Sequence, residues 1–434
     1  MGGSNLRSVE KWLFVNLILI IIVQSFVGCS VETNKQKFPN STIANSKIQK
    51  IRLALWDYDA VEYDKKLIEA FTKRYPNIHV EVISFPGDQY DKKLAVKLEG
   101  ESDIDVFYAQ TEERVVNLSL NKQVKDIDEL ITRDKINLSQ YNKIDKINNK
   151  IYGLPYRSDF RVLYYNKDIF DKNKISYPTN DMTWEEYRNL GKRLTSVNGK
   201  NKTYGIFMLP LYLAQQNLQG EQFDLVKSDL NMLRPGIKLL MNIQMVDKSA
   251  VDYGTNESLN ANQLTFEKGD SAMFIYGTWF INYLVKDKES EKFNFNWGMA
   301  KIPHWKGEKQ SDALINTSVC INAKTTKLEA AWTFEKFITG EEGAQILAKE
   351  MILPGHIDNG ILSEFNKNPG LPKGSGAVFR TNKTTNYEVA SEVKYLVSNI
   401  VSDEVENILM KKKSIDQGIS DMMKRRKEIQ NQNK

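Results

Sequence analysis

The chain has 434 residues, of which 26% are charged and 41% are hydrophobic, and its formal net charge is +5. Basic and acidic residues are nearly balanced, 60 against 55, so the charge gives no indication of nucleic-acid binding. The length predicts two or more domains, because a single core stops growing near roughly 250–300 residues. Two cysteines and three histidines exclude a disulfide framework and leave little material for a Cys/His zinc site. We expect neither a metal nor a cofactor.

The N-terminus has the pattern of an export signal. Basic residues precede an apolar run, 12–23, that is shorter than the roughly 20 residues of a membrane span. A small residue and Cys29 follow, which resembles a bacterial lipobox, although Phe26 stands where that motif usually has Leu. We predict a signal peptide over residues 1–28 and lipidation of Cys29. The alternative is an uncleaved N-terminal anchor, and both interpretations place the rest of the protein outside the cytoplasm, at a membrane face.

A polar segment follows this cysteine. Residues 29–49 are rich in Asn, Ser, Thr, Lys and Gln, which is typical of a flexible tether. After processing, Cys320 is the single remaining thiol. It lies in an apolar run, so we interpret it as a core residue.

Strands and helices alternate where the folded part begins. Short apolar strands are followed by amphipathic helices, which indicates a βαβ series. Such a series predicts a parallel, doubly wound α/β sheet. The predicted elements are strands 51–56, 79–83 and 104–108, a helix that ends near residue 74, and a helix over about 90–98.

The remainder of the chain also mixes strands and helices. Thr183 and Glu186 have the spacing of a capping box, in which the Thr side chain caps the helix and the Glu side chain reaches back. The predicted elements are strands 162–166 and 271–276 and helices 183–194, 327–338 and about 415–429.

Motifs of common enzyme classes are absent from the sequence. It contains no P-loop, no dinucleotide-binding glycine pattern and no Gly-x-Ser-x-Gly. None of the three histidines has a local motif of a general base. A pair of carboxylates for glycoside hydrolysis stays open, since dozens of acidic residues are present at unknown separations. We predict that the protein is not an enzyme, with a surface glycan-acting enzyme as the less favoured alternative.

Four segments spread over the chain carry further motifs. The first is the strand up to Trp56 followed by 71–78, with Tyr-Pro-Asn-Ile. The second is 152–170, with Tyr-Gly-Leu-Pro and Tyr-Tyr-Asn-Lys-Asp-Ile-Phe, together with 183–187, Thr-Trp-Glu-Glu-Tyr. The third is 266–279, with Phe-Glu-Lys-Gly-Asp-Ser-Ala-Met and Gly-Thr-Trp, and the fourth is 298–303, with Gly-Met-Ala-Lys-Ile-Pro, followed by 330–334, Ala-Ala-Trp-Thr-Phe. In this order they resemble the family 1 extracellular solute-binding proteins of ABC importers, a group that includes the maltose-binding protein. The second segment is the most specific of the four.

The resemblance implies two doubly wound α/β lobes joined by a hinge, the type II fold of periplasmic binding proteins, with the ligand in the interlobe cleft. This agrees with the βαβ series and with ligand binding at the carboxyl ends of strands. The implied limits are 50–157 plus 321–366 for the N-lobe, 162–317 plus 367–434 for the C-lobe, and 158–161 and 318–320 for the hinge.

A sugar site needs flat aromatic surface and planar polar groups, because a sugar presents hydroxyls around apolar C–H faces. Trp279 follows a strand and a glycine, and the family has a ligand-stacking tryptophan at this position. Asp159 lies six residues before Tyr165, where the maltose-binding protein has an acidic ligand residue. The alternative for Trp279 is a packing residue in the core of a lobe. The alternative for Asp159 is a hinge residue paired with Arg157 or Arg161.

Further ligand contacts are implied at the ends of predicted strands. Asn316 and Thr317 stand where the family often has a glycine pair before the second crossover. Trp305 is interpreted as a rim residue, and Trp332 and Trp184 as packing residues. The rest of the predicted ligand-binding set is Trp56, Tyr58, Asp59, Tyr108, Gln110, Tyr156, Tyr276 and Asn316.

The sequence thus predicts a lipid-anchored receptor on the outer face of the cell membrane. It would capture a sugar or oligosaccharide by hinge closure, as a monomer, and deliver it to the permease subunits of an ABC importer, with no role for nucleic acid. The alternative is a binder of the same fold for a polyamine, an iron chelate or a phosphodiester. The aromatic content favours a sugar, whereas Asp57, Asp59 and Asp159 leave a cationic ligand open.

Overall fold

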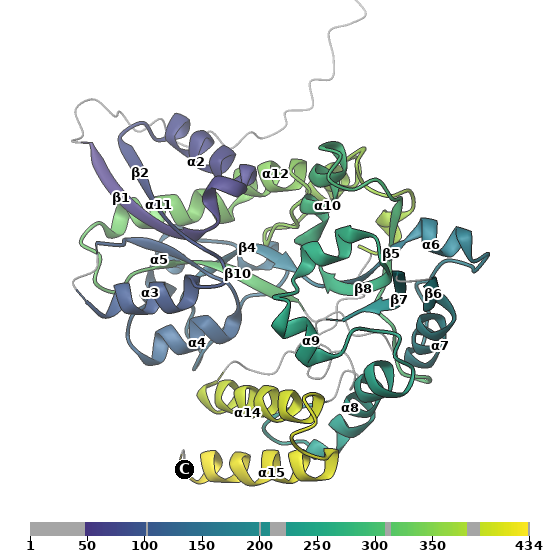
Figure 1. The fold of residues 1–434 in the computed structure, drawn as a ribbon. Helices are drawn as coiled ribbons and strands as arrows, with labels where there is room; N and C mark the ends of the chain where they lie inside the picture. Colours follow the sequence, from purple (N-terminus) through teal and green to yellow (C-terminus); the bar gives the residue numbers. More distant parts are fainter. Residues whose placement is uncertain are drawn as a thin grey trace, which may run out of the picture. The chain divides into compact units, whose positions relative to one another are not determined.

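Two five-stranded sheets form the framework of the protein (Figure 1). The computed structural model describes residues 48–100, 103–198, 201–208, 223–308, 314–379 and 391–432. The predicted signal peptide, Cys29 and the tether up to Lys47 lie outside the described residues. Within these ranges, no helix combines the length and the apolar character needed to cross a membrane.

The first sheet has the strand order β2-β1-β3-β10-β4. β1 runs parallel to β2 and β3, as the βαβ pattern predicts, whereas β10 runs antiparallel to both β3 and β4. Its strands are β1 (Gln49–Trp56), β2 (Ile78–Phe85), β3 (Val106–Ala109), β4 (Leu154–Asp159) and β10 (Ile315–Ile321).

The second sheet has the order β6-β7-β8-β5-β9. β5 lies between β8 and β9 and is antiparallel to both, and β7 is parallel to β8. Its strands are β5 (Arg161–Asn166), β6 (Ser196–Asn198), β7 (Asn201–Phe207), β8 (Ser271–Gly277) and β9 (Trp297–Lys301).

Helices connect and cover the strands (Figure 1). The described helices are η1 (Tyr58–Ala60), α2 (Glu62–Arg74), α3 (Tyr90–Glu99), α4 (Glu112–Leu120), α5 (Asp128–Asp134), η2 (Leu138–Gln140), α6 (Lys167–Lys172), α7 (Trp184–Leu194), η5 (Leu230–Leu233), α8 (Arg234–Met241), the π-helix η6 (Asn242–Val246), α9 (Tyr253–Ser258), η7 (Gln263–Lys268), α10 (Phe280–Glu289), α11 (Leu328–Thr339), α12 (Glu341–Lys349), α13 (Asn359–Asn366), η8 (Ser375–Ala377), α14 (Glu392–Leu409) and α15 (Ile415–Gln432).

Both faces of the first sheet are buried, which explains why β1 is nearly continuously apolar. Leu53 and Leu55 pack in one core with side chains of α2 and α11, whereas Ala54 packs on the opposite face with side chains of α3 and α4. Cys320 of β10 belongs to this second core and is fully buried, as predicted. Trp332 is also fully buried in the first core.

The predicted capping box is confirmed at the start of α7. Thr183 accepts a hydrogen bond from the backbone of Glu186, whose carboxylate accepts one from the backbone N–H of Thr183. Trp184 follows the cap and is buried in the core of the second sheet, with half-buried Trp305 packed against the same core. The two hydrogen bonds of the capping box satisfy N–H groups at the start of α7 that have no partner within the helix.

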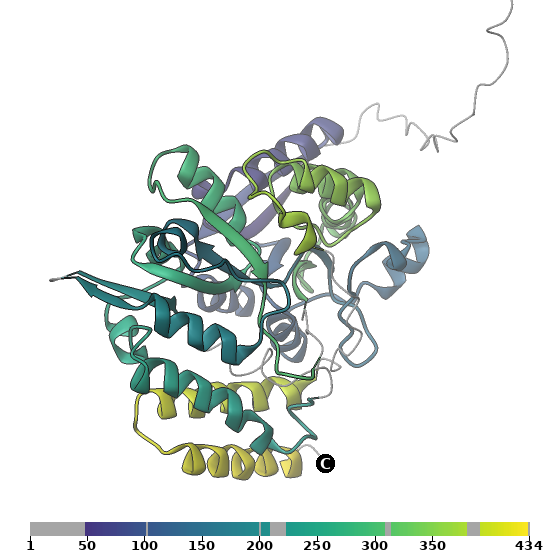
Figure 2. The same ribbon diagram turned by 90° about the vertical axis from the view of Figure 1, so that its right-hand side faces the viewer.

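The C-terminal helices α14 and α15 lie side by side and are drawn in yellow (Figure 2). Val401 of α14 and Met422 of α15 pack in the same core as Ile237 of α8. This core lies against the second sheet, since it also contains Leu163 and Met273.

The chain passes from one sheet to the other within a single residue. β4 ends at Asp159, Phe160 follows, and β5 begins at Arg161. Two hydrogen bonds link Phe160 to Thr278. The Phe160 carbonyl accepts from the Thr278 N–H at 2.9 Å, and the Phe160 N–H donates to the Thr278 hydroxyl at 3.3 Å. β10 belongs to the first sheet from Ile315 onward.

Helices α12 and α13 follow α11 in the chain but pack on a different core. Ala348 and Phe365 lie in the cluster that includes Tyr164, Phe274 and Phe280 of the second lobe. The segment predicted as the end of the N-lobe therefore also contacts the second sheet's helices and strands. The lobe limits themselves stay a prediction.

Candidate functional site

Arg157 lies at the centre of a buried polar cluster beside the passage from β4 to β5. Arg157 is 7% exposed. Nη1 donates to the Tyr63 hydroxyl at 2.8 Å and Nη2 donates to Thr317 Oγ1 at 3.2 Å, while Nε lies 3.6 Å from Asp159 Oδ2. The cluster joins α2, β4 and β10. We call Tyr63, Asp64, Arg157, Asp159 and Thr317 the Arg157 cluster.

Aromatic rings surround this guanidinium group. Its central carbon lies 5.8 Å from the ring centre of Trp56 and 5.3 Å from that of Tyr156. The Tyr108 ring lies 6.2 Å from the Trp56 ring and 4.5 Å from the Tyr156 ring. A guanidinium within about 6 Å of an aromatic face is attracted by the ring quadrupole. The structure thus brings together three of the predicted aromatic ligand residues, although Tyr108 and Tyr156 are fully buried.

The second lobe contributes aromatic residues from the end of β8. Trp279 is half-buried at the start of α10, and its ring lies 5.2 Å from that of Tyr276, nearly perpendicular to it. A Cβ at Gly277 would lie 2.1 Å from the Trp279 ring, so glycine allows the ring to lie against the strand end. The Thr278 hydroxyl donates to Asp159 Oδ1 at 2.7 Å, which links this segment to β4.

Tyr283 is a residue that the sequence analysis missed. It lies one helical turn after Trp279 on α10 and is half-buried. Burial raises its pKa, and among charged groups Asp57 of the first lobe raises it most, while the positive charge of Arg157 lowers it. Tyr283 also packs against the cluster that contains Phe280 and Tyr164. An aromatic residue four positions after Trp279 shares its helix face, and this spacing is the signal that could have identified it.

Two buried carboxyl groups have raised pKa values. Burial raises the pKa of Asp159, against the opposing effects of the Arg157 charge and the Thr278 hydrogen bond. Burial also raises the pKa of Asp64 to about 7, although the Arg157 charge and the nearby Tyr108 hydroxyl lower it. Within the described part of the chain, Asp159 Oδ2 and the Tyr156 hydroxyl accept or donate no hydrogen bond. These atoms are available to a hydrogen-bonding ligand once they are reached.

Asn316 belongs to a second buried network, and its side chain is fully engaged. Its Nδ2 donates to Asp145 Oδ2 at 2.9 Å, and its Oδ1 accepts from the Ser158 hydroxyl at 2.6 Å. Lys143 Nζ lies 2.9 Å from Glu112 Oε2 and 2.7 Å from Asp145 Oδ1. We call Glu112, Lys143, Asp145, Ser158 and Asn316 the Lys143 network. Only Asn316 of this network was among the predicted ligand residues.

The other predicted residues lie at the edge of the Arg157 cluster. Tyr58 and Gln110 are half-buried, and the Gln110 carbonyl accepts a 3.4 Å hydrogen bond from Thr317 Oγ1. Burial raises the pKa of Tyr58, and the nearby charge of Asp64 raises it further. Asp59 is exposed, and its carbonyl accepts a hydrogen bond from Lys65 at 3.1 Å.

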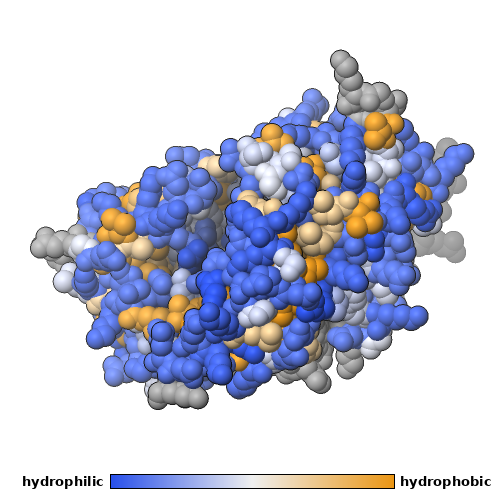
Figure 3. Space-filling view, turned by 60° about the horizontal axis from the view of Figure 1, so that its bottom comes forward, coloured by the Kyte–Doolittle hydropathy of each residue, from blue (hydrophilic) through white to orange (hydrophobic). Residues whose placement is uncertain are grey.

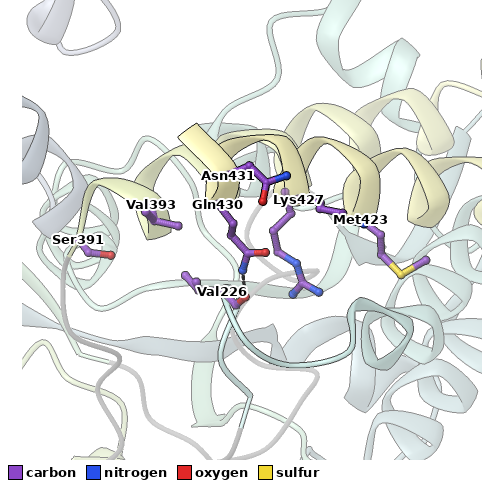
Figure 4. A pocket seen from close by; sticks show the side chains of 8 residues that line it. Val226, Ser391, Val393, Met423, Lys427, Gln430 and Asn431 are labelled. Carbon is purple, nitrogen blue, oxygen red and sulfur yellow. Dashed lines mark hydrogen bonds between the residues drawn. The ribbon is translucent and has the colours of Figure 1, made fainter. Parts of the chain in front are cut away.

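The protein surface is hollowed between two masses of side chains, and hydrophilic side chains line that hollow (Figure 3). Two recesses lie elsewhere. One has a volume of about 800 Å³, and Figure 4 shows side chains of α14 and α15 on its wall. The other has about 540 Å³ and lies beside α6. Neither is lined by a predicted ligand residue. Across the described ranges, no group of three or more His, Cys, Asp or Glu side chains is placed to hold a metal ion.

Relatives of known type match most of the chain. An arabinooligosaccharide-binding protein of Bacillus subtilis is 22% identical over 352 residues, which cover 75% of each chain. A galactooligosaccharide-binding protein of the same organism is 22% identical over 330 residues, 71% of this chain and 74% of that protein.

Solved structures share the fold. A sugar transporter from Rhizobium etli in an open conformation has 28% identity and a TM-score of 0.69, covering 87% of this chain and 99% of its own. An ABC substrate-binding protein from Listeria monocytogenes in complex with cycloalternan has 22% identity and a TM-score of 0.75, covering 89% and 99%. The predicted fold class, two α/β lobes of the type II binding-protein fold, is confirmed.

A family model described as "Bacterial extracellular solute-binding protein" matches residues 59–345, which is more than half of the chain. This range begins just after β1 and includes the Arg157 cluster, Trp279 and the return to the first sheet at β10. The chain therefore belongs to the bacterial extracellular solute-binding proteins.

Proposed function

We propose that this protein is the receptor of an ABC importer and captures a sugar or oligosaccharide between its two lobes. It acts as a binder and not as an enzyme. It works as a monomer, anchored through lipid on Cys29 to the outer face of the cell membrane, and hands its ligand to the permease subunits. The anchor has a direct test: Cys29→Ala should abolish incorporation of labelled fatty acid, and an unlabelled wild type would contradict it.

One observation carries the proposal: an aromatic ring of the first lobe and a segment of the second lobe both contact a buried polar cluster that still has unused hydrogen-bonding atoms. Trp56 of β1 lies beside the Arg157 guanidinium group. Asp159, next to Arg157, accepts a hydrogen bond from Thr278, which precedes Trp279 in the chain and follows Tyr276 by two residues. This combination matches the two surfaces of a sugar, because aromatic faces accept its C–H side and charged groups bind its hydroxyls.

The relatives support a carbohydrate as the ligand. Three relatives are named as binding proteins for arabinooligosaccharides, galactooligosaccharides and multiple sugars. Two proteins with similar solved structures were determined in complex with cycloalternan or maltotriose. In our proposal Trp279 and Trp56 are stacking platforms and Asp159 accepts hydrogen bonds from hydroxyls. Tyr58, Asp59, Tyr108, Gln110, Tyr156, Tyr276 and Asn316 complete the proposed ligand-binding set.

A thermal-shift screen against mono- and oligosaccharides tests the function. A ligand at 100 times its Kd should stabilise the folded state by about 2.7 kcal/mol, because it binds the native state only. The same mixtures, analysed by thin-layer chromatography, should contain unchanged sugar. Stabilisation by no carbohydrate, or the appearance of hydrolysis products, would contradict the proposal.

A substitution at Trp279 tests whether the ligand binds in the cleft. Trp279→Ala removes a half-buried aromatic platform, so affinity for the ligand should fall at least about tenfold, or 1.4 kcal/mol. Tyr177→Ala is the control, since Tyr177 is 39% exposed and packs with Tyr165 and Phe170, away from the Arg157 cluster. Equal affinities of the two variants would remove Trp279 from the site.

A further inference from the structure

Two buried carboxyl groups lie beside the guanidinium group of Arg157. Asp64 and Asp159 both lie beside the single guanidinium group of Arg157, and Asp57 follows Trp56 at the end of β1. Asp57 is half-buried, with Oδ1 accepting from the Gly87 N–H at 2.9 Å. Asp64 and Asp159 thus share one cation, and Asp57 lies at the end of β1.

The positive side chains at the edge of the cleft are already paired. Lys65 Nζ donates to Glu62 Oε1 at 2.9 Å. Lys66 and Lys286 both pair with Glu350, the latter at 3.7 Å. These lysines therefore do little to offset Asp57, Asp64 and Asp159.

Arg157 does not fully satisfy Asp159. Its two Nη groups donate to Tyr63 and Thr317, and only Nε faces Asp159 Oδ2, at 3.6 Å, beyond hydrogen-bond length. Asp159 is 1% exposed, and within the described residues its Oδ2 accepts no hydrogen bond. A buried carboxylate oxygen in this state is stabilised most by a charged donor, because charge-assisted hydrogen bonds are roughly twice as strong as neutral ones.

The rings around these carboxylates favour the same kind of donor. Trp56 lies beside the Arg157 guanidinium group, and Tyr276 and Trp279 flank Thr278, whose hydroxyl donates to Asp159. A cation over an aromatic face gains about 0.5–2 kcal/mol, more when it is desolvated. Carboxylates and rings together form a site for a positive charge next to a flat apolar surface.

We propose that the sugar bound in this cleft carries a protonated amine, so that the substrate class is an amino-sugar oligosaccharide. The inference rests on the proposed function and narrows it. The ammonium group replaces a hydroxyl of a neutral sugar, donates to Asp159 Oδ2, and stabilises the ionised form of this buried carboxyl group. The sugar rings stack on Trp279 and Trp56.

A matched pair of ligands tests this class. Glucosamine oligomers and N-acetylglucosamine oligomers of the same length differ only in the charge and acylation of the amine. Calorimetry on the full-length protein should show the glucosamine oligomer binding at least tenfold more tightly. Equal or weaker binding of the glucosamine oligomer overturns the inference, and binding of neutral oligosaccharides alone overturns it while leaving the proposed function standing.

Spermidine is the third ligand, since it carries amines without a sugar. Spermidine binding as tight as that of the glucosamine oligomer would overturn both the amino-sugar class and the sugar function. Asp159→Asn should reduce the preference for the glucosamine over the N-acetylated oligomer to within about threefold. Asp416→Asn, at an exposed position on α15, should retain it. If Asp159→Asn fails to fold, the ligand pair on the wild type still decides.

Discussion

Asp64 is a buried carboxyl group in the first turn of α2, and its protonation affects stability. Its pKa is raised to about 7 from an ordinary value of 3.8, so the folded state holds this proton more tightly than the unfolded state does. The resulting stabilisation is complete below about pH 4 and is lost as the pH rises to about 7. Each pKa unit corresponds to about 1.4 kcal/mol.

Asp64→Asn should therefore flatten the fall in unfolding free energy between about pH 4 and 7. The measurement is urea unfolding across this window. Glu267, whose pKa burial and Asp287 raise to about 7, gives a slope of the same sign, so the informative quantity is the difference between wild type and variant. Asp416→Asn is the control and should keep the wild-type slope. An unchanged slope in Asp64→Asn would mean that Asp64 is ionised throughout.

Gly277 controls the position of the Trp279 ring. Its φ lies outside the left-handed region, so alanine is compatible with the backbone, but the added Cβ would lie 2.1–2.3 Å from the ring. Gly277→Ala should displace the ring and lower ligand affinity about tenfold or more, measured by calorimetry. Gly100→Ala is the matched control, because a Cβ at this position has no atom within 4 Å. This variant should bind the ligand like the wild type. Wild-type affinity in Gly277→Ala would show that the ring does not contact ligand from this position.

At the scale of elements, the Lys143 network ties β4 and β10 to the segment after η2 and to the start of α4. Lys143 lies between half-buried Glu112 and buried Asp145, at 2.9 and 2.7 Å. Lys143→Met removes the ion-pair partner of buried Asp145, and breaking a buried pair costs roughly 3–5 kcal/mol. We expect a loss of that size in unfolding free energy.

Chemical denaturation of two lysine variants measures this effect. Lys367→Met removes an exposed pair with Glu364 and should cost under about 1 kcal/mol. A comparably small loss in Lys143→Met would mean that water reaches Glu112 and Asp145.

At the scale of the whole molecule, the two lobes bury part of the proposed site, with Asp159 and Tyr156 each 1% exposed. A ligand can enter only if the lobes separate, and it favours the closed form only through contacts made in both lobes. Small-angle scattering should therefore show a smaller radius of gyration after the ligand is added. Trp279→Ala at the same ligand concentration should show less of this change. A radius that stays constant at saturation would argue against hinge closure.

Features of the fold that depend on residues close together in the chain could be predicted from the sequence. The alternation of apolar strands and amphipathic helices identified β1, β2 and β3 as a parallel unit, and the spacing of Thr183 and Glu186 identified the start of α7. Both follow from hydrogen bonds and burial within short stretches of chain. Aromatic residues at strand ends likewise indicated part of the candidate site, with the family resemblance supplying their roles.

Contacts between distant segments were decided by the tertiary structure. The partners of Arg157 come from residues 94 and 160 positions away, Tyr63 and Thr317, so no local pattern contains them. The Lys143 network arises in the same way. A buried charge takes whichever partner the packing of separate elements brings near. Periodicity along the chain therefore determined the elements, whereas the antiparallel insertion of β10 and the partners of Arg157 exist only in the folded molecule.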